Sequence, residues 1–544
     1  DVLGGLVGSE MCIRDRSCAK RVTAAAPSSD DQVTCAGEPT PFDVIIIGAG
    51  LSGIGAACHL RRQCPERSVL ILEARAQMGG TWDLFRYPGI RSDSDMHTLG
   101  YNFKPWTQAE ALADGPAILA YIRETAREND IEAQIRYRQR VRRADWDSTA
   151  QCWTLTVEDD DSGEVASYRA RFLHSCSGYY RYDHGHQPEF PGRENFAGVF
   201  VHPQHWPEDL DYRDKRVVII GSGATAMTLV PAMADTAAHV TMLQRSPTYV
   251  ISHASKDRIG SLLRAVLPER LAYRLTRAKN VAMQSWFYRR TRTAPDKVRR
   301  MLLKDVAKRL GSSGDIADFS PSYDPWDQRL CLLPDGDLFQ AIRSGRAEVV
   351  TAEIDCLVAD GIRLTDGTVL PADIIVSATG LELEVLGGVD FAVDGAPVEF
   401  PGSWSYRGVM LTGLPNMVSV FGYINASWTL RADIVSQWFC RLLNHMRETG
   451  AGAVVPALRP GDEDMAPRPW IDGFSAGYMQ RAMSRFPRQG DREPWVNSQD
   501  YKRERREFAE MDMGESALRY TPVAVEISRA PGGGPAPAGA DAGP

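Results

Sequence analysis

The stretch FDVIIIGAGLSGIGAACHL, residues 42–60, decides the fold of this chain. It begins with a continuous apolar run, which is typical of a buried parallel strand. Gly48, Gly50 and Gly53 then give the pattern G-x-G-x-x-G where that strand should meet a helix. Glycines there permit a tight turn and let backbone N–H groups and the helix N-terminus approach a pyrophosphate. The stretch therefore predicts a strand, a turn and a helix that bind a dinucleotide.

The residues that follow strengthen this interpretation. SVLILE, residues 68–73, has the pattern of a second strand and ends in Glu73, twenty positions after Gly53. A carboxylate at this place accepts hydrogen bonds from ribose hydroxyls and repels a 2′-phosphate. The alternative is a surface acid that merely ends a strand.

A second unit repeats this pattern. RVVIIGSGATAMTLVPAMA, residues 216–234, contains another glycine-rich turn that begins at Gly221, and HVTMLQRSP supplies its second strand. Here the strand ends in Arg245 and Ser246 rather than in an acid. Because a guanidinium can bind a phosphate bidentately, this site should prefer NADP over NAD. The second strand ends in an acid in the first unit and in an arginine in the second unit. This difference indicates FAD in the first unit and NADPH in the second.

A third apolar strand predicts how the two units are connected. PADIIVSATG, residues 371–380, should return the chain from the second unit to the first. We therefore expect an α/β fold with two Rossmann-like dinucleotide-binding domains, the NADP domain inserted in the FAD domain. The expected regions are a non-native or disordered leader (1–41), a first segment of the FAD-binding domain (42–195), a linker (196–214), the NADP-binding domain (215–375, with a helical insert at about 256–310), a second segment of the FAD-binding domain with the C-terminal region (376–525), and a disordered tail (526–544).

Composition limits the other possibilities. The 544 residues carry a net charge of −8, which argues against nucleic acid as a partner. The ten cysteines form no C-x-x-C pair, so a redox dithiol is not indicated and a reducing cytoplasm is expected. The uncharged runs 44–60 and 408–430 contain glycines, a proline or asparagines and are expected in buried core rather than in a membrane. Four histidines between 184 and 205 have no matching carboxylates or cysteines, so no metal site is expected.

Two further segments carry a family resemblance. Residues 79–95 read GGTWDLFRYPGIRSDSD, and residues 196–207 fit F-x-G-x-x-x-H-x-x-x-W-P at every fixed position. Together they resemble the class B flavoprotein monooxygenases, and the second is similar to the Baeyer–Villiger fingerprint. PWDQRLC and FGYINASWTLRAD are most similar to the branch that contains the ethionamide-activating monooxygenase. The resemblance extends from Phe42 to Arg506.

The resemblance implies an FAD- and NADPH-dependent monooxygenase. Such an enzyme inserts one atom of O2 into a ketone through a peroxide on the flavin, giving an ester or lactone, and sulfoxidation of thioethers accompanies it. An N- or S-oxygenating flavin monooxygenase and a non-enzymatic flavin-binding sensor are the alternatives. A pyridine nucleotide–disulfide reductase is disfavoured by the missing C-x-x-C. The sequence leaves the oligomeric state open.

The resemblance also assigns functional residues. Arg329 in PWDQRLC corresponds to the active-site cation that stabilises developing negative charge, and Asp93 should steady it beside the flavin. His202 and Trp206 should couple the two domains during turnover. Gln328 stands where the family often has a lysine, which leaves Arg245 with more of the NADP preference.

The expected residues fall into two groups. The catalytic group is Arg329, Asp93 and His202. The residues expected to bind the cofactors are Gly48, Gly50, Ser52, Gly53, Glu73, Gly80, Thr81, Trp82, Asp83, Leu84, Asp93, Val141, Arg91, Ser92, Gly221, Ser222, Gly223, Ala224, Thr225, Ala226, Arg245 and Ser246.

A basic segment interrupts the second unit. Residues 256–309 contain sixteen lysines and arginines against four acids, a local balance of +12 in an acidic protein. SLLRAVLPERLAYRL within it has the apolar spacing of a helix. One interpretation is a solvated helical subdomain that lies over the NADP domain. The other is an amphipathic face that rests on an anionic membrane.

Overall fold

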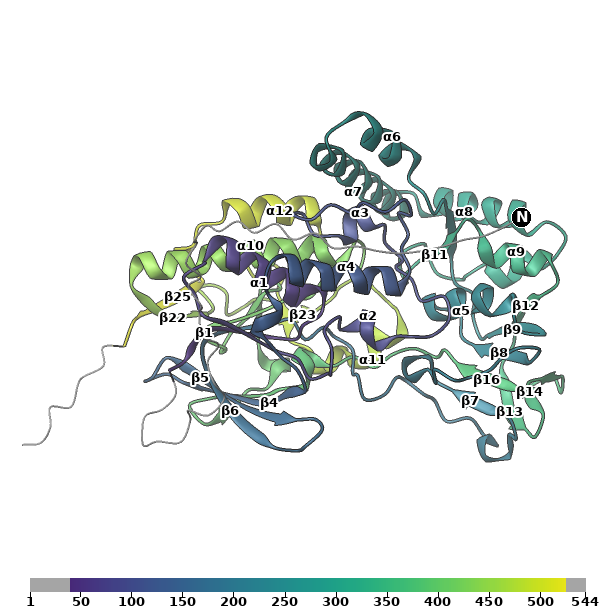
Figure 1. The fold of residues 1–544 in the computed structure, drawn as a ribbon, viewed down its shortest axis with the longest axis horizontal. Coiled ribbons are helices and arrows are strands. Elements are labelled where there is room, and N and C mark those ends of the chain that lie inside the picture. Colours follow the sequence, from purple (N-terminus) through teal and green to yellow (C-terminus); the bar gives the residue numbers. More distant parts are fainter. Residues whose placement is uncertain (1–39, 525–544) are drawn as a thin grey trace, which may run out of the picture. The chain divides into compact units, whose positions relative to one another are not determined.

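The computed structural model describes residues 40–524, whose two larger β-sheets, one mixed and one parallel, are flanked by helices (Figure 1). The expected tail and nearly all of the expected leader lie outside these residues. Within residues 40–524, no helix combines the length and the apolar character needed to cross a membrane.

The first sheet combines a parallel region with an antiparallel region. Its strand order is β18-β17-β4-β5-β6-β1-β2-β3, with β21 paired to β6. β6 pairs antiparallel with β5 near its beginning and parallel with β1 and β21 near its end, so one strand belongs to both regions. The strands are β1 (Phe42–Ile47), β2 (Val69–Leu72), β3 (Ile135–Arg136), β4 (Gln139–Asp147), β5 (Cys152–Asp159), β6 (Val165–Ser175), β17 (Asp390–Val393), β18 (Ala396–Pro397) and β21 (Met417–Ser419).

Helices pack on the parallel region of this sheet. α1 (Leu51–Gln63) lies against α10 (Trp428–Thr449) and contacts α4 (Gly115–Glu128), and together they bury the largest apolar core. Cys58 is fully buried in α1, and burial raises the pKa of its thiol to about 12. The cysteine is therefore a packing residue of this core.

The second sheet is fully parallel and has the order β12-β9-β8-β16-β7. Its strands are β7 (Val199–Val201), β8 (Arg216–Ile220), β9 (His239–Gln244), β12 (Ala347–Thr351) and β16 (Ile374–Ser377). α5 (Ala224–Ala234) and α9 (Asp337–Arg343) share a buried core with this sheet. A three-stranded antiparallel sheet shares a second core with it through its strands β13 (Ile354–Val358), β14 (Gly361–Leu364) and β15 (Val369–Pro371).

Two strands of this sheet differ from the sequence-based boundaries. β7 lies inside the segment expected as a linker, and β16 ends at Ser377, beyond the expected domain end at 375. Three residues of β7 are too few for alternation of apolar residues to reveal a strand. The fingerprint segment thus contributes an edge strand to the second sheet.

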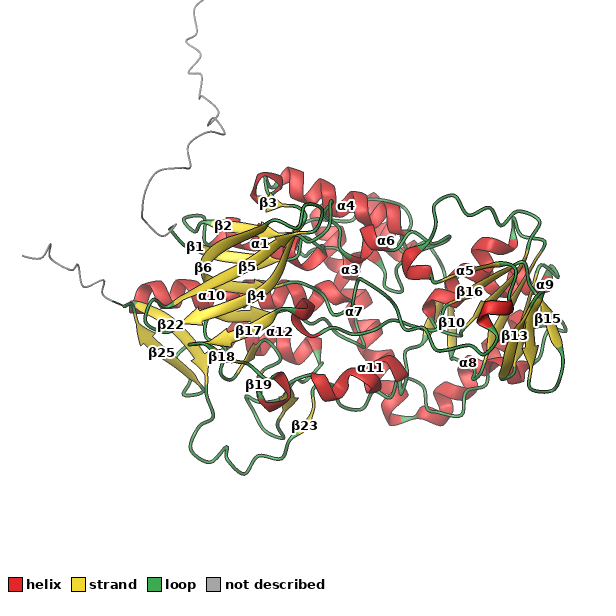
Figure 2. Cartoon of the chain, turned by 90° about the horizontal axis from the view of Figure 1, so that it is seen from below, coloured by secondary structure: helices red, strands yellow, loops and turns green. Residues whose placement is uncertain are grey.

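The basic segment forms three helices, α6 (Arg258–Val266), α7 (Glu269–Thr293) and α8 (Pro295–Leu310). α8 contacts α9 beside the second sheet, but α7 packs on α3 (Met96–Leu99) and bonds to α10 beside the first sheet. Figure 2 shows α7 between the two groups of strands in that view. The helical subdomain expected over the NADP domain therefore also contacts helices beside the first sheet through α7.

The C-terminal region packs beside the first sheet. It includes α11 (Gly477–Ala482), α12 (Tyr501–Glu510) and short strand pairs. Those strands are β19 (Ser405–Tyr406), β20 (Met410–Leu411), β22 (Ala451–Pro456), β23 (Arg468–Pro469), β24 (Arg488–Gln489) and β25 (Leu518–Pro522). A further pair, β10 (Val250–His253) and β11 (Cys331–Pro334), lies beside the second sheet, and β11 begins two residues after Arg329.

Candidate active site

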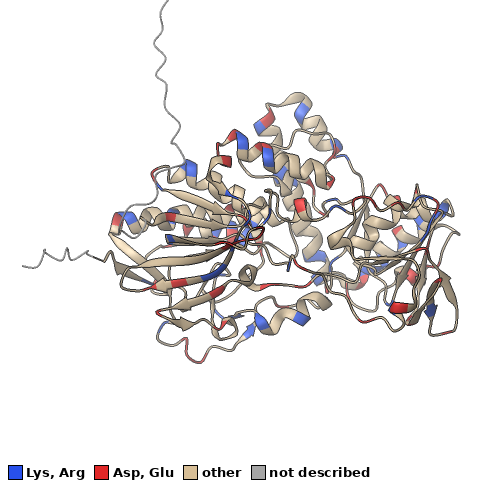
Figure 3. Cartoon of the chain, turned by 60° about the horizontal axis from the view of Figure 1, so that its bottom comes forward, with Lys and Arg blue, Asp and Glu red and all other residues tan. Residues whose placement is uncertain are grey.

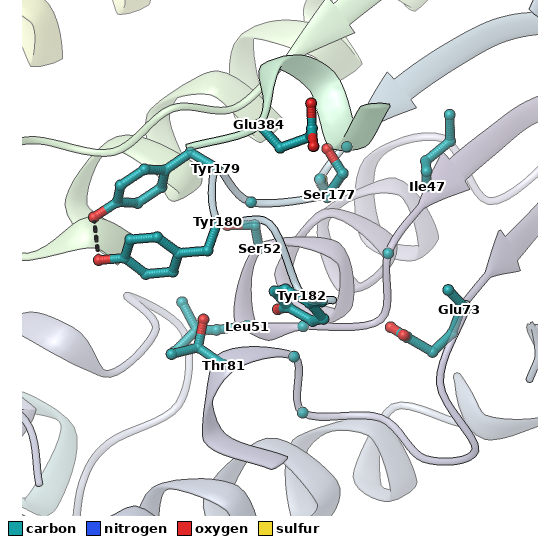
Figure 4. Close-up of a pocket in the computed structure, with 18 of the residues that line it drawn as sticks. Ile47, Leu51, Ser52, Glu73, Thr81, Ser177, Tyr179, Tyr180, Tyr182 and Glu384 are labelled. Atoms are coloured by element: carbon teal, nitrogen blue, oxygen red, sulfur yellow. Dashed lines mark hydrogen bonds between the residues drawn. The ribbon is translucent and has the colours of Figure 1, made fainter. Parts of the chain in front are cut away.

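A cavity of about 280 Å³ lies at the carboxyl ends of β1, β2 and β6 (Figure 4). Ligands of open α/β sheets bind at this edge. Eight residues predicted from the sequence line it: Gly48, Gly50, Ser52, Glu73, Gly80, Thr81, Trp82 and Val141. Gly53, Asp83 and Leu84 are not among the lining residues.

The first glycine turn leaves no room for side chains. Gly48 has a φ of +100°, and a Cβ on it would lie 2.7 Å from the carbonyl oxygen of Cys176. A Cβ on Gly53 would lie 1.9 Å from the carbonyl oxygen of Gly48. Both distances are far below a carbon–oxygen contact, so only glycine allows this backbone. Gly53 thus permits the helix to begin close to the strand without touching the cavity itself.

Glu73 stabilises the same turn through hydrogen bonds to the backbone. Its Oε2 accepts a hydrogen bond from the Ala49 N–H at 2.7 Å, and its Oε1 accepts one from the Arg75 N–H at 2.9 Å. Burial raises the pKa of Glu73 overall, although these two hydrogen bonds act to lower it. The side chain is buried but borders the cavity, so its carboxyl group lies between the turn and the cavity.

Asp83, predicted to bind a cofactor, does not line the cavity. Its carboxylate is buried and bonds to Arg75 at 2.8 Å, with Arg86 at 3.4 Å and Arg123 at 3.6 Å. These ion pairs hold α2 (Thr81–Leu84) against its surroundings. Asp83 therefore supports the loop that borders the cavity.

An aromatic wall that was not predicted from the sequence borders the cavity. Tyr179, Tyr180 and Tyr182 follow β6 and line the cavity, and the hydroxyls of Tyr179 and Tyr180 lie 2.7 Å apart. Tyr179 stacks on Trp428 with ring centroids 5.0 Å apart, and Trp428 donates a hydrogen bond to Ser52 at 2.8 Å. The run GYYRYD directly after a buried strand could have revealed these tyrosines.

A second cavity, of about 820 Å³, lies at the carboxyl ends of β8 and β16. Tyr180 lines both cavities, so they share a wall. The predicted residues that line the second cavity are Asp93, Gly221, Ser222, Gly223, Ala224, Thr225, Arg245, Ser246 and Arg329. Gln328 lines it as well, whereas Arg91, Ser92 and Ala226 do not.

The second glycine turn has the geometry of the first. Gly221 has a φ of +136°, and a Cβ on it would lie 2.3 Å from the carbonyl oxygen of Ala378. A Cβ on Gly223 would meet nothing within 4 Å. The space above Gly223 is therefore open to a ligand at the N-terminus of α5.

The guanidinium groups of Arg245 and Arg91 differ in whether they are free to bind a ligand. Arg245 is exposed at the second cavity and forms no ion pair within residues 40–524. Arg91 instead bonds to Asp337 at 2.6 Å, and the hydroxyl of Ser92 accepts a hydrogen bond from the Ser94 N–H at 2.9 Å. Of these two arginines, Arg245 therefore offers its guanidinium to a ligand at this end of the cavity.

Arg329 and Asp93 face each other in the second cavity. The Arg329 Nε lies 3.6 Å from the Asp93 Oδ2. Burial lowers the pKa of the guanidinium, but Asp93 and the phenols of Tyr179, Tyr478 and Tyr180 raise it, and the net shift is upward. Arg329 therefore stays positively charged beside the wall that the two cavities share.

His202, predicted as catalytic, lines neither cavity but contacts Gly380, which lines the second one. Its Nδ1 accepts a hydrogen bond from the Gln204 N–H at 3.2 Å, so its Nε2 carries the proton and donates to the Gly380 carbonyl at 3.2 Å. Burial lowers the pKa of His202, which favours this neutral form. Trp206 packs against the apolar core of the second sheet. His202 and Trp206 thus connect residues 196–207 to the segment that follows β16 and to the core of the second sheet.

Comparisons with known proteins agree with this geometry. Residues 110–298 match the family described as flavin-binding monooxygenase-like, and residues 46–114 match an NAD(P)-binding Rossmann-like domain. The FAD-containing monooxygenase EthA of Mycobacterium tuberculosis (strain ATCC 25618 / H37Rv) is 50% identical over 481 residues, covering 88% of this chain and 97% of that protein. The probable FAD-binding monooxygenase AlmA of Acinetobacter sp is 48% identical over 483 residues, covering 88% and 96%.

Solved structures show the same fold. A steroid monooxygenase bound to NADP superposes with a TM-score of 0.72 at 23% identity, covering 89% of this chain and 100% of that one. A cyclohexanone monooxygenase bound to ε-caprolactone gives a TM-score of 0.68 at 20% identity, covering 88% and 100%.

The chain belongs to the family of FAD-containing flavin monooxygenases. The resemblance predicted from the sequence is thereby confirmed, and so is the α/β fold with its Rossmann-like units. As a member of this family the protein is a monooxygenase that uses FAD and NADPH to act with O2 on a small molecule.

Proposed function

We propose that the protein is a Baeyer–Villiger monooxygenase that converts ketones to esters or lactones and also oxidises thioethers. The observation that carries this proposal is the Arg329–Asp93 pair, which lies in the cavity of the second dinucleotide unit and beside the wall shared with the first. Bound FAD, once reduced by NADPH, supplies the redox chemistry that activates O2.

The first cavity fits FAD. The Gly48–Gly53 turn presents backbone N–H groups and the N-terminus of α1 to a pyrophosphate, and Glu73 borders the cavity where ribose hydroxyls would bind. The tyrosines after β6 and Trp428 offer flat apolar surfaces for an aromatic ring system. Polar groups at one end and aromatic rings at the other match the two ends of this cofactor.

The second cavity fits NADPH. Gly223 leaves space for a pyrophosphate at the start of α5, and the free guanidinium of Arg245 would bind the 2′-phosphate. We propose the first sheet with residues 42–195 and 376–525 as the FAD domain, and residues 215–375 as the NADP domain. Residues 196–214 would join them, and their edge strand would move with the second sheet.

Arg329 would stabilise the negative charge that develops when oxygen is transferred to a carbonyl carbon. Asp93 would orient the guanidinium without neutralising it, because only one oxygen approaches and the separation is 3.6 Å. His202 would act through the backbone, since its Nε2 proton is donated to Gly380 and is not free for transfer. We therefore assign His202 as a positioning residue.

The test is a product screen with the holoenzyme. Cyclic and linear ketones and aryl alkyl thioethers are offered with NADPH in air, and ester, sulfoxide, NADPH consumption and hydrogen peroxide are measured. We expect ester formation from at least one ketone, with less peroxide released than NADPH consumed. Sulfoxide without any ester from a broad ketone set would favour an N- or S-oxygenating monooxygenase.

We also propose peripheral contact with an anionic membrane in the cytoplasm. The support is the +12 balance of residues 256–309 within a chain whose net charge is −8. Apolar ketones partition into bilayers, so an enzyme at the surface would meet them at a higher concentration.

A further inference from the structure

Apolar side chains are exposed together on α6 and α7. Seven of the thirteen large hydrophobic side chains that are exposed within residues 40–524 lie on these two helices. Ile259, Leu262 and Val266 on α6 are 55%, 64% and 68% exposed, and Leu271 and Leu275 on α7 are 43% and 44% exposed. Spacings of three and four residues place them on one side of each helix. Such a cluster marks an interaction surface rather than scattered surface residues.

The opposite side of the α6–α7 pair is fixed to the body of the protein. Arg264 donates hydrogen bonds to the carbonyl oxygens of Thr107 and Gln108 at 2.8 and 2.9 Å. Tyr273 donates to the Tyr101 carbonyl at 2.9 Å, and Asp257 bonds to Lys279 at 2.6 Å. These bonds fix the inner side of the helix pair to the body of the protein, so the apolar side is held outward.

A basic cavity lies next to this apolar side. It has a volume of about 470 Å³ and is lined by Arg62 of α1, by Arg270 and Arg274 of α7, and by four uncharged residues. Arg270 and Arg274 are exposed and form no ion pair within the described region of the chain. Arg62 bonds to the Asn129 side chain at 2.8 Å and lies over the Phe103 ring at 4.0 Å. Three guanidinium groups without a carboxylate in the lining form a site for an anion (Figure 3 shows the basic residues of these helices in blue).

We propose that α6, the first turns of α7 and Arg62 form a docking face for an anionic lipid bilayer. The exposed aliphatic side chains would enter the headgroup region, and the Arg62–Arg270–Arg274 cavity would take a lipid phosphate. This inference deepens the membrane contact proposed above and rests on it. It is independent of the chemistry proposed for Arg329.

Charge and hydrophobicity together favour a bilayer over other partners. If two copies of this chain paired through this face, segments with a balance of +12 each would oppose one another. An acidic protein bound by the arginines alone would leave Leu262 and Val266 in water. An anionic bilayer satisfies both sets of residues at once.

The test is flotation of the holoenzyme with vesicles of phosphatidylcholine alone or mixed equally with phosphatidylglycerol, at low and high salt. We expect binding only to the mixed vesicles, weakened by salt. Arg270→Ala with Arg274→Ala should lower the membrane partition coefficient roughly 25-fold, because each basic residue near the surface contributes about a factor of five. Leu262→Asp with Val266→Asp should also lower it, because two carboxylates replace apolar side chains at an anionic headgroup region. Val165→Asp, at an apolar residue 69% exposed on β6, and Arg127→Ala, at an exposed arginine of α4, serve as matched controls.

The outcomes separate the two proposals. Wild-type protein that stays unbound at low salt overturns both the membrane contact and this face. Binding that survives both pairs of substitutions overturns the face but keeps the membrane contact. Lipid-free dimerisation that Leu262→Asp with Val266→Asp abolishes would assign the face to a second copy of the chain. Ketone turnover in vesicle-free solution should be unchanged in every variant, and this reports on the proposed chemistry separately.

Discussion

At the scale of single residues, the charge of Arg329 is the feature on which the proposed chemistry depends. A unit charge about 4 Å from developing negative charge, at an effective dielectric of about 20, is worth about 4 kcal/mol. Removing it with Arg329→Ala should lower kcat for a ketone about 1,000-fold while FAD stays bound. Ester formation and flavin absorbance measured on the same sample check this. Arg481→Ala, in the same cavity, is the control, and unchanged turnover in Arg329→Ala would remove Arg329 from the mechanism.

Gly53 and Gly223 form a natural pair for testing the two glycine turns. Gly53→Ala puts a Cβ 1.9 Å from a backbone oxygen, whereas Gly223→Ala meets no atom within 4 Å. We expect Gly53→Ala to be purified with little or no yellow cofactor. Gly223→Ala should keep its flavin but show a raised KM for NADPH, because the new methyl group fills space meant for a pyrophosphate. Equal flavin content in both variants would contradict this account of the first turn.

The sequence predicted the residues whose role depends on the backbone. Both glycine turns and the position of Glu73 follow from local geometry, so a short pattern suffices to find them. Asp83 was placed at the cavity by resemblance, but its carboxylate is bound by three arginines, two of them outside the segment that suggested it. Side-chain partners depend on tertiary packing, and a linear pattern does not encode them.

At the scale of elements, the bond between α7 and α10 fixes where the basic segment lies. Arg277 lies 3.3 Å from Asp433 and donates to the Gly100 carbonyl at 2.6 Å, and both side chains are nearly buried. Arg277→Ala leaves the Asp433 carboxylate with fewer donors and should lower the free energy of unfolding by about 3 kcal/mol. Urea denaturation followed by tryptophan fluorescence measures this. Arg270→Ala, on the exposed side of α7, should change it little.

His174 in β6 makes stability depend on pH. It is fully buried, its Nδ1 donates to the Val418 carbonyl at 3.2 Å, and burial lowers its pKa to about 4. The unfolded chain therefore binds a proton near pH 6.5 that the folded chain does not bind until about pH 4. This contribution to stability is complete above pH 6.5 and is lost as the pH falls toward 4.

Between pH 7 and pH 5 the expected loss is about 2 kcal/mol. His174→Leu removes the titrating group, so its unfolding free energy should change less over the same interval than that of the wild type. Urea denaturation at the two pH values tests this. Parallel pH dependence in the two proteins would show that His174 is not responsible.

The missed elements are those that are short or held by distant contacts. β7 has three residues, and its pairing with β16 joins positions far apart in the sequence. The helices of the basic segment were expected from periodicity, but the attachment of α7 to the helices of the first sheet depends on Arg277 and Asp433, which are 156 positions apart. Periodicity predicts that a helix forms and does not predict which neighbour it contacts.

At the scale of the whole molecule, His202 ties the connector to the strand that leads back to the first sheet. His202→Phe removes the hydrogen bond to the Gly380 carbonyl without touching Arg329. NADPH oxidation should continue, but the ratio of ester to NADPH should fall several-fold and hydrogen peroxide should rise. His205→Phe, three residues later and exposed, should leave the ratio unchanged. A His202→Phe enzyme with the wild-type ratio would limit His202 to a packing role.

Tyr180 stands between the two chambers of the molecule, and this sets a limit on redesign. A smaller residue at 180 would open the shared wall to bulkier substrates, but it would also let water into the space between the two cavities, where oxygen transfer is proposed to occur. The same substitution would then widen the substrate range and lower the share of NADPH oxidation that gives oxygenated product. Libraries that aim only at a wider substrate range should therefore leave position 180 alone and diversify the surrounding shell.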